Sequence, residues 1–396
     1  MQARTEVEQA LEHQADQIEL VLANHRVSVR VLGGTVSPRW IRYQVNPEIT
    51  VRVSRITALS EEIALRLGAP SVRISRQGSA VQIEVPRHDG QTVRLLQLGR
   101  QLGQIPRQTA ILGLDESGLP LLLRLASPEV AHVLIAGTTG SGKTALARSM
   151  AISLAMHNRL GEVQLLFIDP KRTGFAPFAS FSEAEYLPHM LRPVVDDVHQ
   201  AIFLLGEMVT EMIRRDRERI SEPRLIIFID EVADLMEQGG KAMDRLMTRL
   251  TQRGRSAGLH LIACTQKPLA ATIGSLTRSN FPVRLVGSVA SADDARLAAG
   301  IPGTGAEKLL GRGDFLLVVK GQVNRFQAAY LSEVELKQIV AQLQARHRTT
   351  RRWLPAPQTA VAEQLAATGT EGRLRSQVLR ERGLKAIFGQ QLRLIK

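Results

Sequence analysis

The sequence predicts an α/β protein in which a mainly parallel β-sheet is covered by helices and is preceded by a small α+β domain. Two observations lead to this fold class. From about residue 126 onward, short apolar segments alternate with helical patterns, as is typical of parallel strands joined by helices. Before that point, short segments of alternating polarity surround helical patterns. A chain of 396 residues is long enough to build two such domains with separate cores.

The small domain is expected over residues 1–125. Its first segment has apolar residues at helical spacing, including Leu11, Ile18 and Leu22, with charged residues between them. This spacing predicts an amphipathic helix over residues 4–24. Strands are expected at 27–33, 40–45, 72–76 and 81–85, with a helix at 58–67.

The second domain is expected over residues 126–345. Strands are predicted at 132–137, 163–169, 225–230, 259–264, 283–287 and 315–320, and helices from Lys143 onward and near 195–218, 240–253 and 292–299. Methionines at helical spacing predict core or interface packing, namely Met208, Met212, Met243 and Met247. Residues 346–396 form a basic linker and a helical tail. This tail is equally compatible with a helix-turn-helix unit, a solvated basic helix and a truncated domain.

The composition favours a polyanionic partner. With 51 Lys and Arg against 38 Asp and Glu, the formal net charge is +13, which points to nucleic acid more than to anionic lipid or to solubility alone. The longest apolar runs have the length of strands, so the sequence predicts no membrane segment and a cytoplasmic protein. Cys264 is the one cysteine, which excludes an internal disulfide. His260 is interpreted as a core residue.

The segment GTTGSGKT, residues 137–144, follows a predicted strand and opens a predicted helix. It matches a phosphate-binding loop (P-loop), in which glycines let backbone N–H groups point at phosphate oxygens and the helix dipole adds positive potential. Lys143 is expected to reach the β- and γ-phosphates, and Thr144 to bind Mg²⁺. The residues expected to bind ATP are Gly137, Thr138, Thr139, Gly140, Ser141, Gly142, Lys143 and Thr144.

Two further strands are predicted to end in charged residues beside this loop. Asp230 and Glu231 follow the apolar segment LIIFI. Asp230 suits a position near Mg²⁺, and Glu231 suits the polarisation of a water molecule for attack on the γ-phosphate. The alternative is a pair of acids that stabilise the start of a helix. In IDPK, Asp169 and Lys171 place a carboxylate and an ammonium group at the same edge of the sheet.

Several motifs together resemble the motor module of the FtsK/SpoIIIE family of double-stranded DNA translocases. They are AGTTGSGKT, IDPK, FIDEVADL, RSAGLHLIACTQKP and LTRSNFPVRL, with VSRITALSEEIALRLGAPSVRI and IEVP in the small domain. The resemblance runs from about residue 4 to about residue 340. It implies a RecA-like P-loop NTPase domain, with ATP and Mg²⁺ bound between the subunits of a hexameric homo-oligomeric ring around double-stranded DNA.

The resemblance also implies roles for particular residues. Glu231 would be the catalytic base, and Gln266 would sense the γ-phosphate or the attacking water. Arg255 falls where the family has an arginine finger that acts on the neighbouring subunit, and Arg253 is the alternative. An arginine suits this role because its charge is permanent and its fork spans two phosphate oxygens.

The family's DNA-contacting positions correspond to Lys267 and Arg278. At a third position where the family has a basic residue, this chain has Ala292. Either Arg296 takes its place, or each subunit contacts DNA with fewer positive charges. The resulting prediction is an ATPase that translocates duplex DNA. The alternative is an ATP-gated DNA-binding assembly or recruitment factor with weak turnover. The basic charge argues against a third class, ring ATPases that move polypeptide.

Overall fold

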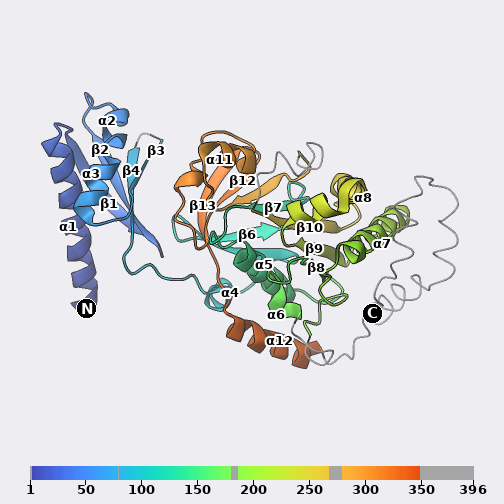
Figure 1. Ribbon diagram of the computed structural model, residues 1–396. Coiled ribbons are helices and arrows are strands. Elements are labelled where there is room, and N and C mark those ends of the chain that lie inside the picture. Colours follow the sequence, from blue (N-terminus) through green and yellow to red (C-terminus); the bar gives the residue numbers. More distant parts are fainter. Residues whose placement is uncertain (1, 79, 180–185, 267–278, 348–396) are drawn as a thin grey trace. The chain divides into compact units, whose positions relative to one another are not determined.

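The computed structural model describes residues 2–78, 80–179, 186–266 and 279–347, which build two β-sheets (Figure 1). The chain divides into two compact units, Met1–Val93 with Leu114–Leu119 and Arg94–Gly113 with Pro120–Lys396. Lys267, Arg278 and all but the first residues of the expected tail at 346–396 lie outside the described residues. No helix in the described part of the chain is long and apolar enough to cross a membrane.

The first unit contains a four-stranded antiparallel sheet with strand order β1-β2-β4-β3. Helix α1 places Ile18 and Leu22, both fully buried, in a core with Tyr43 and Ile83 from the sheet. The amphipathic pattern of residues 4–24 therefore predicts the buried side of this helix correctly. The elements are α1 Gln2–Asn24, β1 Val29–Val36, β2 Trp40–Pro47, α2 Val53–Thr57, α3 Ser60–Leu67, β3 Arg73–Gln77 and β4 Ala80–Pro86.

The second unit contains a nine-stranded sheet with strand order β6-β5-β13-β12-β11-β7-β10-β9-β8. Strands β11, β7, β10, β9 and β8 are parallel, and β12 runs antiparallel to both β11 and β13, so the predicted α/β class is confirmed. The strands are β5 Thr109–Asp115, β6 Pro120–Arg124, β7 Val133–Ala136, β8 Val163–Ile168, β9 Arg224–Ile229, β10 Leu259–Thr265, β11 Val283–Val286, β12 Asp314–Val319 and β13 Gln322–Ala328.

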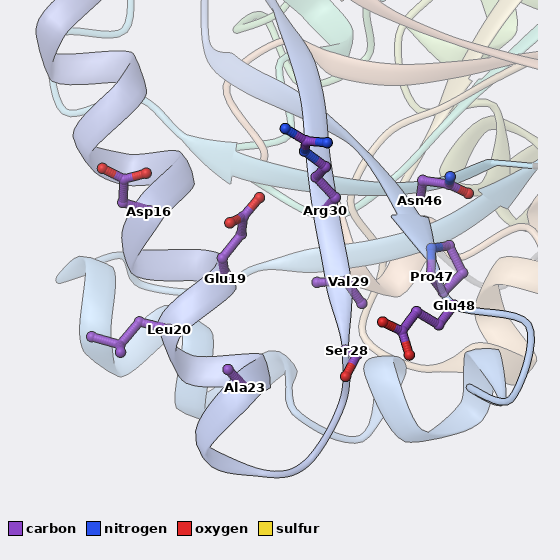
Figure 2. Close-up of a pocket in the computed structure, with 10 residues that line it drawn as sticks. All are labelled: Asp16, Glu19, Leu20, Ala23, Ser28, Val29, Arg30, Asn46, Pro47 and Glu48. Carbon is purple, nitrogen blue, oxygen red and sulfur yellow. The ribbon is translucent and has the colours of Figure 1, made fainter.

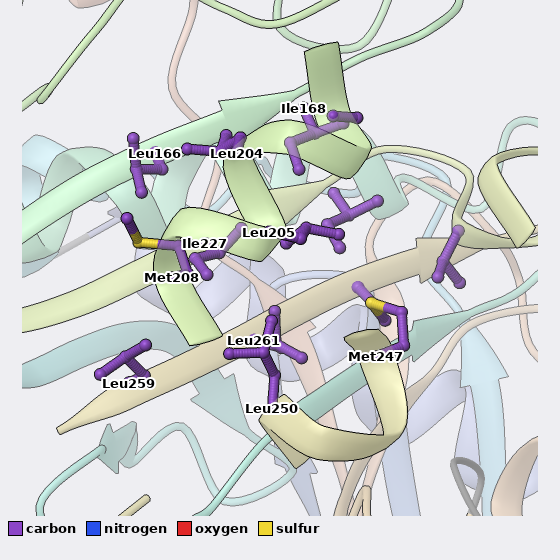
Figure 3. Packing of buried hydrophobic residues seen from close by; sticks show 14 of the residues in the cluster. Leu166, Ile168, Leu204, Leu205, Met208, Ile227, Met247, Leu250, Leu259 and Leu261 are labelled. Atoms are coloured by element: carbon purple, nitrogen blue, oxygen red, sulfur yellow. The ribbon is translucent and has the colours of Figure 1, made fainter. Parts of the chain in front are cut away.

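Both faces of the parallel part are apolar because helices cover both. On one face, α7 Val198–Glu218 and α8 Val232–Arg253 pack on the sheet. Leu204, Met208 and Met247 of these helices share one buried cluster with Leu166, Ile227 and Leu261 of the strands (Figure 3). Alternate strand residues point to the other face, where α5 Lys143–His157 contacts β7, β8 and β10. The four methionines predicted to pack in the core are all buried.

The structure differs from the sequence-based expectation at several elements. Helix α8 begins at Val232 rather than near 240, and Gly240 interrupts it with φ +52°. Residues 109–124, for which no strand was predicted, form β5 and β6 of the nine-stranded sheet, where Ala329 N donates a hydrogen bond to Leu112 O. The elements that were not predicted are α2, α4 Leu95–Leu102, β5, β6, α6 Ala176–Ala179, a 3₁₀ turn Ala306–Lys308, β13 and α12 Glu333–His347.

Candidate nucleotide site

The P-loop connects β7 to the start of α5, as the sequence predicted. The loop requires a glycine at position 142. Gly142 has φ +101°, and a Cβ atom added there would lie only 2.9 Å from Gly313 N. Thr138 N donates to Ser288 O (2.8 Å), and Ser141 Oγ donates to Thr138 O (2.7 Å). The loop is therefore held in a curled form at the carboxyl edge of the sheet.

Lys143 is buried inside this loop. Its Nζ donates to Thr138 O (2.9 Å), and only 5% of the residue is exposed. Burial lowers the pKa of this ammonium group, and the nearby Glu231 and Asp230 carboxylates oppose that effect. Lys143 is thus a desolvated cation whose hydrogen-bond acceptor is a neutral carbonyl.

Strand β9 brings the two predicted acids to the same edge. Thr144 Oγ1 donates to Asp230 Oδ1 (3.2 Å), so the two residues expected to bind Mg²⁺ lie together. Burial raises the pKa of the Asp230 carboxyl, and the neighbouring Asp169 carboxylate raises it further. Negative charge is therefore concentrated beside the P-loop threonine.

Glu231 occupies a left-handed backbone conformation, with φ +54° and ψ 68°. Such a conformation costs a non-glycine residue about 1–3 kcal/mol and is often found at functional sites. Its carboxylate accepts hydrogen bonds from Thr265 Oγ1 (2.9 Å) and Gln266 N (3.0 Å) at the tip of β10. Glu231 is also the residue that precedes α8, where an acid is favoured by the helix dipole, but its side chain makes no capping bond and is used in the contacts with Thr265 and Gln266.

Gln266 connects the P-loop with Glu231. Its side-chain oxygen accepts from Thr139 Oγ1 (2.7 Å), while its backbone N–H faces Glu231. Gln266, the polar residue that follows the buried strand β10, thus lies between the P-loop, where the phosphates are predicted to bind, and Glu231, where the attacking water is predicted to lie. Thr265 was not predicted as a site residue, although a threonine that ends an apolar strand beside the glutamine was a visible signal.

Arg255 and Arg253 lie at the opposite end of β10. This seven-residue strand spans about 20 Å at about 3.3 Å per residue, so Arg255 is far from the P-loop of its own chain. Arg253 Nη2 pairs with Asp216 Oδ2 (2.9 Å). The Arg255 side chain is exposed and makes no hydrogen bond or ion pair with any described residue.

The third predicted DNA-contacting position lies within the described residues. Ala292 begins helix α11 (Ala292–Ala299), whose preceding residue Ser291 accepts from Asp294 N (3.1 Å). Arg296 on this helix pairs with Asp293 (3.6 Å), and its side chain is 57% exposed. The acids after Ala292 therefore stabilise a helix start, and Arg296 remains accessible.

A shallow pocket lies in the first unit, between α1 and the ends of β1 and β2 (Figure 2). Asp16, Glu19 and Glu48 line it together with Arg30. Glu19 Oε1 accepts a hydrogen bond from Val31 N (2.6 Å), so this carboxylate holds α1 to strand β1. No residue that the sequence predicted for the site lies in this pocket.

A P-loop, an aspartate beside its threonine and a glutamate beside a strand-end glutamine define the chain as a P-loop ATPase of the α/β class. Residues 100–222 and 216–270 match the FtsK/SpoIIIE family, and residues 1–87 match the FtsK alpha domain. The chain belongs to the FtsK/SpoIIIE family.

Relatives with known names agree with this assignment. The chain is 34% identical over 366 residues to the DNA translocase SftA of Bacillus subtilis, covering 85% of this chain and 37% of SftA. It is 34% identical over 357 residues to the DNA translocase FtsK of Staphylococcus epidermidis, covering 82% and 43%. The chain therefore spans about two fifths of these relatives.

Among solved structures, the fold is similar to the pCW3 conjugation coupling protein TcpA in its monomer form with ATPγS. The TM-score is 0.57 at 18% identity, and the match covers 84% of this chain and 99% of TcpA. At this identity the similarity concerns the fold.

Proposed function

We propose that this protein is an ATP-driven motor that moves double-stranded DNA through a hexameric ring in the cytoplasm. The observation that carries the proposal is the meeting of the P-loop, Asp230, Glu231 and Gln266 at one edge of the sheet. The relatives named DNA translocases and the net charge of +13 support duplex DNA as the track.

ATP binds with its phosphates in the P-loop, where Lys143 exchanges its carbonyl acceptor for phosphate oxygens. The other backbone N–H groups of the loop and of the start of α5 donate hydrogen bonds to the negatively charged phosphate oxygens. This exchange is favourable because a buried ammonium group gains more from a charged oxygen than from a neutral one.

Thr144 and Asp230 fit a Mg²⁺ ion. Hydroxyl and carboxylate oxygens are the ligands that Mg²⁺ prefers. Burial first and the neighbouring Asp169 carboxylate second raise the pKa of the Asp230 carboxyl, and a bound cation would offset both effects. When bound, the ion supplies charge neutralisation on the phosphates.

Glu231 acts as the base that orients and polarises the attacking water. Its carboxylate is fixed by Thr265 and by the backbone of Gln266, so little reorganisation is needed. The side chain of Gln266, already at the P-loop, then responds to the γ-phosphate. Loss of that phosphate shifts the tip of β10, from which the chain continues directly into Lys267.

Arg255 serves the neighbouring subunit. It is exposed and lies about 20 Å along β10 from the P-loop of its own chain, so it reaches a nucleotide only across a head-to-tail interface, which closes into a ring. Arg253 is less suited because Asp216 already pairs with it. Lys267 and Arg278 contact DNA phosphates, which give grip without sequence information.

The test measures ATP hydrolysis with increasing lengths of duplex DNA, together with displacement of a third-strand oligonucleotide. A motor hydrolyses faster on long duplex and displaces the third strand only with ATP. Strong stimulation by DNA without displacement would instead favour an ATP-gated assembly factor. Lys143→Ala is the matched control and should show neither activity.

A further inference from the structure

Asp169 is a fully buried carboxylate that has no part in the hydrolysis steps proposed for Lys143, Asp230 and Glu231. It follows β8 directly and is 0% exposed. Its Oδ2 accepts a hydrogen bond from Phe175 N (2.8 Å), whereas its Oδ1 has no hydrogen-bond partner among the described residues. Buried polar atoms are nearly always hydrogen-bonded, and an unpaired carboxylate oxygen is costly.

The unpaired oxygen belongs to a residue adjacent to Asp230. Strands β8 and β9 pair in parallel with Ile168 opposite Ile229, so Asp169 and Asp230 follow at the same level on neighbouring strands. Neighbouring strands lie about 4.8 Å apart. The Asp169 carboxylate also raises the pKa of the Asp230 carboxyl, because like charges at this separation repel each other.

The loop after Asp169 closes over this pair of acids. An added Cβ on Gly174 would overlap the carboxylate of Asp230, so the loop backbone lies directly against that side chain. Arg148 of α5 donates to the carbonyls of Thr173 (3.0 Å) and Gly174 (2.5 Å), which fixes the loop.

The cationic side chains nearby are directed elsewhere. Arg148 interacts electrostatically with both aspartates, but it donates its hydrogen bonds to the loop carbonyls. Lys171 pairs with Asp234 Oδ2 (2.7 Å). Neither residue supplies the missing partner of Asp169 Oδ1. A water molecule in the hydration shell of a bound divalent cation would supply it.

We propose that Asp169 is a second carboxylate of the divalent-cation site, whose Oδ1 accepts a hydrogen bond from the hydration shell of the ion held by Thr144 and Asp230. The inference rests on the proposed function. It makes Asp169 a positioning residue for the cation, because carboxylates outside the direct ligands commonly orient such ions and change metal affinity by about 10- to 100-fold.

The test is Asp169→Asn, since the amide oxygen can still accept from Phe175 N. Binding of Mn²⁺ is measured by electron paramagnetic resonance in the presence of ATPγS, and thermal unfolding is measured without metal. We expect Mn²⁺ affinity to fall about 10-fold or more. The metal-free unfolding midpoint should stay the same or rise, because one of two adjacent like charges is removed.

Asp197→Asn is the matched control. Asp197 caps α7 by accepting from Gln200 N (2.9 Å), and asparagine caps equally well. Unchanged Mn²⁺ affinity in Asp169→Asn would overturn the inference, as would a loss of affinity no larger than that of the control. If wild-type ATPγS binding were insensitive to Mn²⁺, the proposed function itself would fail, which is a separate outcome.

A second measurement uses the wild-type chain and does not depend on a variant that folds. Fe²⁺ with ascorbate and peroxide replaces Mg²⁺ and generates radicals that cut the backbone near the ion. Cuts next to Asp169 as well as Asp230 are expected. Cutting at Asp230 and Thr144 without cutting at Asp169 would contradict the placement.

Discussion

The two ends of strand β10 are built differently. At its carboxyl end, Glu231 has a strained backbone, and Asp169 has an oxygen that no described residue pairs with. At its amino end, buried Arg215 donates to Pro223 O (2.7 Å) and Ala257 O (3.1 Å), so its polar groups are engaged. At the carboxyl end a hydrogen-bond acceptor is left for a ligand, whereas at the amino end the hydrogen-bond donors of Arg215 hold neighbouring backbone segments together.

The amino end holds the turn that carries Arg255. Asp216 of α7 pairs with Arg253 and accepts from Ser256 Oγ (3.3 Å). Gly258 follows with φ +74°, and an added Cβ would overlap the backbone of Ser221. Arg255 therefore sits on a turn that is held on both sides, and substitutions at the two ends should have different consequences.

The largest effect is expected from Arg255→Ala. Removal of an arginine finger costs about 10³- to 10⁵-fold in turnover. ATP hydrolysis should fall by this range in the DNA-stimulated assay, and mixing with Lys143→Ala subunits should restore part of it at hybrid interfaces. Arg253→Ala is the control. A larger loss in Arg253→Ala would reassign the finger.

The next effect is expected from Glu231→Gln. The amide oxygen can still accept from Thr265 and Gln266, but the amide cannot act as a base, so hydrolysis should fall about 10²- to 10⁴-fold. Binding of a fluorescent ATP analogue should remain, and the variant should still assemble on DNA. Wild-type turnover would contradict the assignment of Glu231.

At the amino end of β10, we expect a substitution to lower the free energy of unfolding by an amount comparable to the catalytic loss in Glu231→Gln. Arg215→Met removes the buried partner that donates from Nε to the Glu211 carboxylate (2.8 Å), which keeps Arg214 as its other partner (2.6 Å). Breaking a buried pair typically costs about 3–5 kcal/mol of unfolding free energy, and the remaining partner places the loss near the lower end of this range, measured by urea titration. Arg217→Met, exposed on the same helix, should change it by less than about 0.5 kcal/mol. Equal effects would contradict the role given to buried Arg215 in holding this end of the chain.

The smallest effect concerns pH and His260. Its Nδ1 donates to Ala131 O (2.7 Å) and its Nε2 accepts from Arg224 (2.9 Å), so the ring is neutral, and burial followed by Arg224 lowers its pKa to about 4. Because the unfolded chain binds a proton near pH 6.5, this residue makes unfolding free energy decrease as pH falls from about 6.5 to about 4. The decrease amounts to about 3 kcal/mol.

Urea titrations between pH 7 and pH 4 measure this slope. His260→Gln removes the share of this histidine and should reduce the slope over that range. The neighbouring His132 keeps its own share, because burial lowers its pKa to about 3. Glu231→Gln is the control, because Glu231 contacts the other end of β10. This variant should keep the contribution of His260 to the pH dependence of the unfolding free energy. A slope that is unchanged in His260→Gln would show that other groups dominate.

Local patterns predicted much of this molecule. The alternation of apolar strands with helices predicted the parallel sheet, and the spacing in residues 137–144 predicted the strand–loop–helix order of the P-loop. Helix α12 was missed although its Ser332 and Glu335 form a reciprocal capping pair, visible as Ser-x-x-Glu. Strands β5 and β6 were not predicted, and their place in the nine-stranded sheet depends on strand pairing across the chain, which leaves no local pattern.

The sequence by itself determined the elements and the chemistry of each strand end, because spacing and side-chain type act locally. It could not determine which groups meet. Glu231 reaches Gln266 across 35 positions, and Asp169 comes to lie beside Asp230 only through the pairing of β8 with β9. The sequence places Arg255 just before the strand predicted at 259–264, but only the tertiary structure shows that the other end of β10 lies beside the P-loop strand β7, because the parallel order of the strands decides which residues share an edge.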